Sequence, residues 1–137
     1  MKKILLDTNV VLDVLLERQP HAAASLNVWA AVETGKLEGL LAAHAVTTIH
    51  YLVGKELGIT KANKCIGMIL NVFGVAPVDA RVIREALQLP SADFEHAVTA
   101  AAARIAGCDF VVTRDNKGFR GSLVPAIIPE AVMPLLS

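Results

Sequence analysis

Aromatic residues are scarce in this sequence. They make up 4% of the 137 residues, whereas 54% of the chain is hydrophobic. The core must therefore be built mainly from Leu, Val, Ile and Ala. Those residues are typical of a parallel sheet covered by helices, and they argue against a small aromatic-rich β-barrel.

An excess of charge of either sign is also missing. Lys and Arg together number 13, Asp and Glu also number 13, and the formal net charge is zero. Bulk charge therefore gives no argument for a nucleic-acid partner, although it leaves a local basic patch open.

Cysteines and long apolar runs are few. Cys65 and Cys108 have no metal-ligand spacing, and we expect two reduced, buried thiols rather than a disulfide. The first apolar run meets Asp7 after three residues, too early for a signal peptide, and no run approaches the ~18 residues of a membrane span. We expect one soluble, cytoplasmic domain spanning residues 1–137, with no membrane partner.

Short apolar runs alternate with segments of helical periodicity along the whole chain. Runs that read as strands occupy residues 3–6, 37–42, 75–78, 109–113 and 124–127. Predicted helices follow residue 7 directly, begin at Pro20 and end at Gly35, span 47–57, start at Thr60, Asp79 and Asp93, and form the end of the chain from Pro129. The order predicts an α/β fold, a three-layer α/β/α domain with a parallel, roughly five-stranded sheet.

Acidic residues follow two of the predicted strands. Asp7 comes directly after residues 3–6, and Asp115 follows residues 109–113 by two positions. Asp93, with Glu95, begins the helix that leads into the second of these strands. Strand ends and helix starts share the carboxyl edge of such a sheet, so the three carboxylates should converge there. Clustered carboxylate oxygens suit Mg²⁺ or Mn²⁺, which activate water for phosphodiester hydrolysis.

Each acidic residue also has a purely structural interpretation. Asp7 alone is most often a helix cap, Asp93 an ordinary residue at a helix start, and residues 115–118 a simple turn. Their order and common context favour the functional interpretation.

Three segments together resemble the PIN domain family, whose members are Mg²⁺- or Mn²⁺-dependent ribonucleases and include VapC-type toxins. Residues 6–13 (LDTNVVLD) resemble the opening motif of the family, and residues 93–97 (DFEHA) its Asp-Phe-Glu-Asp-Ala segment. Residues 112–115 (VTRD), followed by Phe119, match its last acidic motif. The resemblance covers essentially the whole chain in the family order.

The resemblance implies roles for individual residues. Asp7 is the central metal ligand, supported by Asn9, and Asp115 is a ligand or a water-positioning acid beside the Thr113 hydroxyl. Asp93 is the third metal ligand.

Two positions depart from the family pattern. Thr48 stands where a Glu is usual, and His96 stands where the third carboxylate is often found. Asp93 and His96 lie three apart on one helical face and are able to share the ligand role, and Mn²⁺ accepts imidazole better than Mg²⁺ does.

Partners follow from the same comparison. Arg114, Lys117 and Arg120 lie next to Asp115 in the sequence and are candidates for contacts with an RNA backbone, although a solvated face is the simpler interpretation. The family resemblance also implies a homodimer and an antitoxin peptide bound in a hydrophobic groove.

The leading hypothesis is a metal-dependent endoribonuclease, the toxin of a toxin–antitoxin pair. The alternative is a catalytically degenerate PIN-like module that binds RNA or a protein partner. A phosphoacceptor receiver domain is disfavoured, because only one Asp follows the first strand and no Lys follows residues 124–127.

Overall fold

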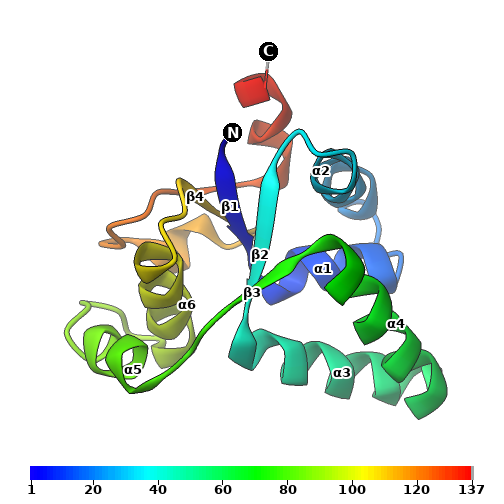
Figure 1. The fold of residues 1–137 in the computed structure, drawn as a ribbon, viewed down its shortest axis with the longest axis horizontal. Helices are drawn as coiled ribbons and strands as arrows, with labels where there is room; N and C mark the ends of the chain where they lie inside the picture. Colours follow the sequence, from blue (N-terminus) through cyan, green and yellow to red (C-terminus); the bar gives the residue numbers. More distant parts are fainter. Residues whose placement is uncertain (137) are drawn as a thin grey trace.

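The computed structural model describes residues 1–136, which form a parallel five-stranded sheet in the order β3-β2-β1-β4-β5 (Figure 1). The strands are β1 (Lys3–Leu6), β2 (Glu38–Ala42), β3 (Gly74–Ala76), β4 (Phe110–Val112) and β5 (Ala126–Ile127). β1 lies in the middle, where Ile4 pairs with Gly39 of β2 and with Phe110 of β4. The predicted parallel sheet is confirmed.

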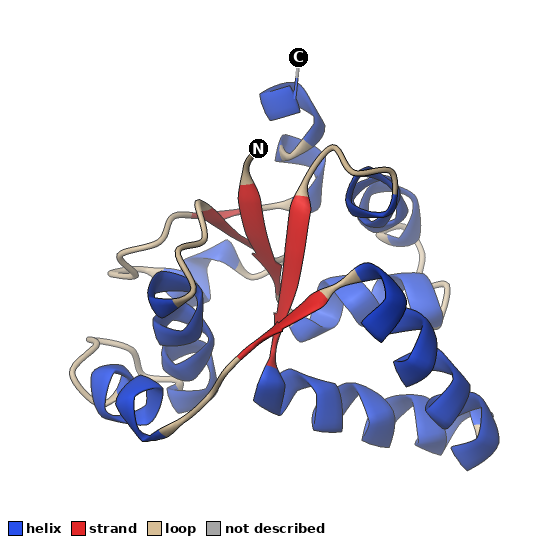
Figure 2. Cartoon of the chain, viewed as in Figure 1, coloured by secondary structure: helices blue, strands red, loops and turns tan. Residues whose placement is uncertain are grey.

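Helices cover both faces of the sheet, with α5 and α6 on one side and α1 to α4 on the other (Figures 1 and 2). Their bounds are α1 (Thr8–Leu15), α2 (Ala22–Glu33), α3 (Ala43–Leu57), α4 (Ile59–Val72), α5 (Ala80–Ala86) and α6 (Phe94–Ile105). Short 3₁₀ turns follow at η1 (Asn116–Phe119), η2 (Pro129–Ala131) and η3 (Met133–Leu136). The predicted three-layer α/β/α architecture is confirmed.

The core divides at the sheet because successive side chains of a strand point to opposite faces. On β1, Ile4 and Leu6 pack into the cluster beneath α1 to α4, whereas Leu5 packs into the cluster beneath α5 and α6. All three are essentially inaccessible to solvent. The strand is thus buried on both faces, as expected for the centre of a parallel sheet.

Some predicted element bounds were wrong. α3 begins at Ala43, four residues before the expected start, because β2 runs straight into the helix and the Ala-rich segment at its start favours helix. α2 begins at Ala22 rather than at Pro20. The chain ends in 3₁₀ turns instead of an α-helix, and Pro134, which lacks an N–H group, lies within the last of them.

The cysteines are free, as expected, but only Cys108 is buried, while Cys65 is half-buried. Among residues 1–136, none of the helices combines the length and the apolar character needed to span a bilayer.

Candidate functional site

Asp7 occupies the carboxyl end of the central strand and caps the start of α1. Its side chain is buried, with 5% of the residue exposed, and its Oδ1 accepts a hydrogen bond from the Thr8 N–H at 2.9 Å. Burial raises the pKa of Asp7 above its usual range, the nearby Glu95 charge adds to the rise, and the hydrogen bonds from Thr113 and Thr8 oppose it. A nearby cation would stabilise the ionised form of this buried carboxylate.

Thr113 connects two of the predicted acids. Its hydroxyl donates to Asp7 Oδ2 at 2.8 Å, and the Asp115 N–H donates to the same hydroxyl oxygen at 3.0 Å. Thr113 is fully buried at the end of β4, so this bridge is fixed by the sheet. The predicted place of Thr113 beside the acids is therefore what the structure shows.

Asp115 begins the η1 turn, where its Oδ1 accepts from the Gly118 N–H at 3.2 Å. A Cβ at position 118 would lie 2.7 Å from Asp115 Oδ2 and 3.2 Å from the His96 ring, so the glycine allows this close approach. The turn thus brings Asp115 against the start of α6.

The first turn of α6 brings Asp93, Glu95 and His96 together. Asp93 caps the helix by accepting from the backbone N–H groups of Glu95 and His96, and these bonds, with the His96 one first, lower the pKa of its exposed carboxyl. One ligand atom from each of the three residues lies within 4.8 Å of the others.

His96 lies between two acids. Its Nδ1 is 2.8 Å from Asp93 Oδ2, and its Nε2 is 3.4 Å from Asp115 Oδ2. The ring also packs edge-on against Phe119, with centroids 4.8 Å apart. The structure therefore brings together Asp93, His96 and Asp115.

The sequence interpretation missed a second set of contacts, between α3 and α6. His44 Nε2 lies 3.1 Å from Glu95 Oε1, and the Thr99 hydroxyl lies 3.1 Å from the same oxygen. The hydrogen bond with His44 is the main cause that lowers the pKa of Glu95. His44 follows the last residue of β2 by two positions, so a search for polar residues just after the predicted strands would also have located it.

The loop before Asp115 is attached to α1. Arg114 Nε donates to Asp13 Oδ2 at 2.7 Å, and Nη2 donates to Oδ1 at 3.1 Å, forming a two-pronged ion pair with a fully buried carboxylate. The Ser25 hydroxyl of α2 donates to Asp13 Oδ2 at 3.4 Å. Asn9 Oδ1 lies 3.5 Å from the Arg114 N–H, so Asn9 supports this loop rather than touching the carboxylates.

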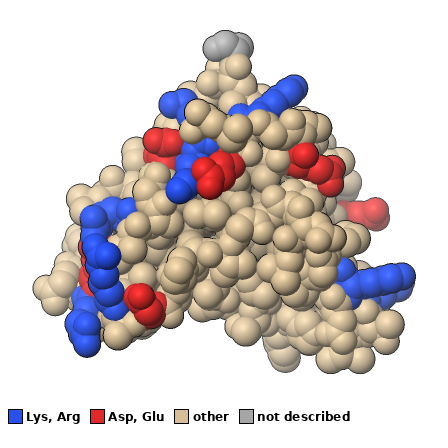
Figure 3. Space-filling view, in the orientation of Figure 1, with Lys and Arg blue, Asp and Glu red and all other residues tan. Residues whose placement is uncertain are grey.

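Three predicted residues lie outside this hydrogen-bonded group. Thr48 is exposed on α3, one turn beyond His44. Lys117 and Arg120 are exposed and line a pocket of about 270 Å³ together with Asp93, His96 and Asp115. Basic side chains form separate groups on the face drawn in Figure 3, several of them beside acidic ones, so this face carries no continuous basic surface.

The arrangement can bind a hard cation. Asp93, Glu95 and His96 group two carboxylates and one imidazole at the start of α6, and the charges of Glu95 and His96 act on the buried Asp7 carboxylate. Such donors are ligands that Mg²⁺ and Mn²⁺ use.

Comparison with known proteins gives a consistent result. A sequence model described as PIN domain matches residues 3–117. The chain is 23% identical to Ribonuclease VapC1 of Aquifex aeolicus (strain VF5) over 120 residues, which cover 84% of this chain and 83% of the relative.

Solved structures share the fold. FitAcB from Neisseria gonorrhoeae superposes with a TM-score of 0.73 at 22% identity, covering 94% of this chain and 99% of that one. A toxin-antitoxin complex from Klebsiella pneumoniae gives 0.69 at 15% identity, covering 92% and 97%. The sequence match spans most of the chain and includes both Asp7 and Asp115. It shows that the chain belongs to the PIN domain family.

Proposed function

We propose that this protein is a metal-dependent endoribonuclease acting in the cytoplasm as the toxin of a toxin–antitoxin pair. The observation that carries the proposal is the buried Asp7 carboxylate, held at the carboxyl edge of the sheet beside the acidic turn of α6. Similarity to a VapC ribonuclease and to a toxin-antitoxin complex supports the same assignment.

The residues present fit a divalent metal ion. The charge of Glu95 helps to raise the pKa of Asp7, so the two carboxylates repel each other. A cation between them would offset this repulsion and the free-energy cost of burying the Asp7 charge. Asp7, Asp93, Glu95 and His96 would hold the ion, with Asp115 at its edge. The imidazole in this set favours Mn²⁺ over Mg²⁺.

A bound ion of this kind lowers the pKa of water and stabilises charge on a phosphodiester. The chain's own residues supply the geometry. Thr113 and the Thr8 N–H hold both oxygens of Asp7, so this carboxylate cannot rotate away. Asp115, fixed by Gly118 and Thr113, is placed to accept a proton from an attacking water.

RNA is the substrate in this proposal. Lys117 and Arg120 line the pocket beside Asp93 and Asp115, where they are able to contact phosphates on either side of the cleaved bond. Arg114, also predicted as an RNA contact, has most of its guanidinium engaged by Asp13 and contributes chiefly by holding the loop.

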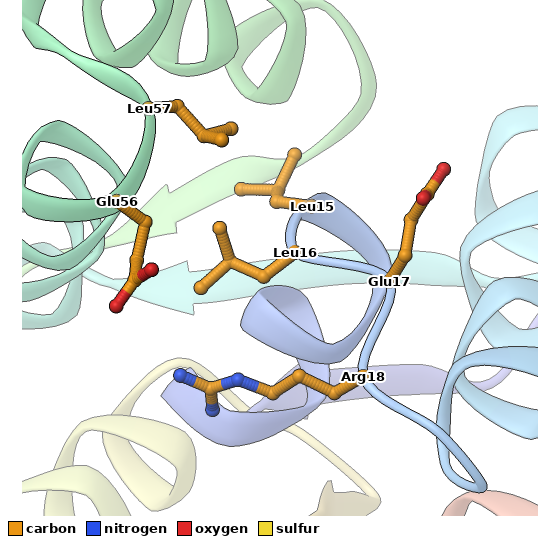
Figure 4. A pocket seen from close by; sticks show the side chains of 6 residues that line it. All are labelled: Leu15, Leu16, Glu17, Arg18, Glu56 and Leu57. Carbon is orange, nitrogen blue, oxygen red and sulfur yellow. The ribbon is translucent and has the colours of Figure 1, made fainter.

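An antitoxin peptide has a suitable groove away from the site. Leu15, Leu16 and Leu57 face one another across a pocket of about 530 Å³ between the ends of α1 and α3 (Figure 4). A neighbouring pocket of about 740 Å³ lies between α1 and α2 and shares Glu17 with the first. An amphipathic helix of the antitoxin would place its apolar residues there.

Self-association also has a candidate surface. Three apolar side chains of α4, those of Ile59, Met68 and Leu70, are more than half exposed. Apolar surface of this kind supports the proposal of a homodimer.

The decisive experiment is a calorimetric titration of the purified protein with Mn²⁺ beside its Asp7→Ala variant. We expect one metal-binding event in the natural protein and none in the variant. Absence of binding in the natural protein would overturn the metal-dependent mechanism and turn attention to partner binding.

A degenerate PIN module remains the rival function, and the exposed Thr48 and the imidazole of His96 are the features that favour it. The double variant Thr48→Glu, His96→Asp distinguishes the two. If the variant cleaves RNA that the natural protein leaves intact, the rival is correct. Cleavage by the natural protein that Asp7→Ala abolishes supports the nuclease.

A further inference from the structure

One face of α3 runs from the site toward the far end of the helix. His44, Thr48, Tyr51 and Lys55 are separated by four, three and four positions, so they lie on one stripe of the helix. The opposite face is buried through Ala45, Ile49 and Val53. We call this stripe the α3 track. It starts at the residue that contacts Glu95 and leaves the site along the surface.

Tyr51 is the most prominent side chain of the α3 track, with 66% of the residue exposed. A pocket of about 340 Å³ lies beside it, lined by His50, Tyr51, Gly54, Lys55 and Ile59. The lining thus contains the phenol ring of Tyr51, the apolar side chain of Ile59 and the cation of Lys55.

Gly54 leaves this pocket open. A glycine inside a helix weakens it, so packing usually explains one that is found there. Here an added Cβ would meet only the Ala62 Cβ, at 3.7 Å, which is an ordinary contact. The packing of α4 on α3 therefore accommodates alanine, and what glycine provides is space next to Tyr51.

The charges around the pocket match a nucleic acid. Lys55 is exposed, forms no ion pair with any residue of the described chain, and no acidic residue lines the pocket. An exposed aromatic ring next to an unpaired cation is the combination that holds single-stranded RNA, since any base stacks on the ring and the cation binds the backbone.

We propose that the α3 track binds single-stranded RNA outside the cleavage site, with one base stacked on Tyr51 in the pocket over Gly54 and a phosphate bound by Lys55. Tyr51 lies seven positions after His44, which is about 10 Å along the helix, so the RNA strand would continue from the site to the pocket. The inference rests on the proposed ribonuclease function for the identity of the ligand, but it does not depend on metal binding or on cleavage.

The test is the affinity of a fluorescently labelled single-stranded RNA of mixed sequence, measured by anisotropy in EDTA so that no cleavage occurs. Tyr51→Ala should weaken binding by about tenfold, and Tyr51→Phe should restore it, because stacking needs only the ring. Lys55→Gln should lower the slope of log affinity against log salt by about 0.7.

Gly54→Ala distinguishes an effect of the pocket on RNA binding from an effect of fold stability. It should stabilise the helix and yet weaken RNA binding by filling the pocket. The matched control is Gly67→Ala on α4, where an added Cβ meets nothing within 4 Å. This control should stabilise the protein equally and leave RNA binding unchanged.

The outcomes are separable from those of the nuclease test. Weaker binding by Tyr51→Ala and Gly54→Ala supports the α3 track even if the protein binds no Mn²⁺ and cuts no RNA. Unchanged RNA affinity in Tyr51→Ala overturns it. If that variant instead alters sedimentation of the free protein, the face is a protein interface. No RNA binding by the natural protein also overturns it.

Discussion

Asp7 carries its charge at a position where burial opposes ionisation, so its contribution to stability depends on pH. Because the pKa of Asp7 is raised in the folded protein, the folded state holds this proton at pH values where the unfolded chain has lost it. Ionised Asp7 therefore lowers the free energy of unfolding above its raised pKa. This cost disappears below the ordinary value of 3.8, where both states are protonated.

Asp7→Asn should accordingly stabilise the protein at neutral pH, by about 0.5–2 kcal/mol, while removing metal binding. Asn keeps one oxygen, which can accept from the Thr8 N–H, and its amide NH₂ takes the place of Oδ2 and can donate to the Thr113 hydroxyl oxygen. Thermal unfolding followed by circular dichroism at neutral pH and well below pH 3.8 checks this. Two results would contradict burial as the cause of the raised pKa of Asp7. One is a variant less stable than the natural protein at neutral pH, and the other is a variant stabilised as much in acid as at neutral pH.

Cys108 should be chemically inert in the native protein. Burial is the main cause that raises the pKa of its thiol to about 11, so almost no thiolate exists at neutral pH. Alkylation by iodoacetamide followed by mass spectrometry should therefore modify the half-buried Cys65 first, and Cys108 only after denaturant is added. Equal labelling of both thiols in the native state would contradict this.

The sequence located part of the site at the residue scale. Asp7, Asp93 and Asp115 were predictable because each lies at a strand end or a helix start, which a local pattern reveals. The contact between His44 and Glu95 was not, because these residues are 51 positions apart and meet only when α3 and α6 pack at the sheet edge. The engagement of Arg114 by Asp13 was hidden for the same reason, at a separation of 101 positions.

At the scale of elements, α2 and the end of α4 press closely on β2. A Cβ added to Gly39 would lie 2.7 Å from Val32 and 2.9 Å from Phe73. Gly39→Ala should therefore destabilise the protein by about 1–3 kcal/mol through overpacking. The midpoint of urea unfolding measures this, and Gly67→Ala, which should raise the midpoint, is the matched control.

The ion pair between Asp13 of α1 and Arg114 in the loop after β4 should contribute more to the free energy of unfolding than a surface ion pair does. Removing Arg114 leaves Asp13 charged and fully buried, so Arg114→Ala should cost about 2–4 kcal/mol. A double-mutant cycle with Asp13→Ala, followed by urea unfolding, should show that the two losses do not add. Additive losses would mean that the pair contributes no coupling energy.

The elements themselves were largely predictable, since apolar runs and helical periodicity mark them in the sequence. The exceptions have local physical causes. No turn residue separates β2 from α3, so the first helical turn was assigned to the preceding loop. β5 has only two residues, and its place beside β4 comes from pairing rather than from its own pattern.

On the scale of the whole molecule, metal binding and folding should be linked, because the proposed ligands come from different elements that assemble only in the native state. Mn²⁺ at a hundredfold its dissociation constant should stabilise the protein by about 2.7 kcal/mol. Differential scanning calorimetry should show a rise in Tm that EDTA reverses. Asp7→Asn should show no rise, and an equal rise in that variant would place the ion elsewhere.

The central position of β1 also has a consequence for synthesis on the ribosome. Asp7 is translated 106 positions before Thr113, whose hydroxyl donates to its carboxylate. β1 likewise pairs in parallel with β4, which is translated long after it. A nascent chain therefore carries Asp7 without the residues that fix it, and the site is completed only after β4 and Thr113 have been made. A ribonuclease of the proposed kind, completed in this order, would leave intact the messenger RNA that is producing it.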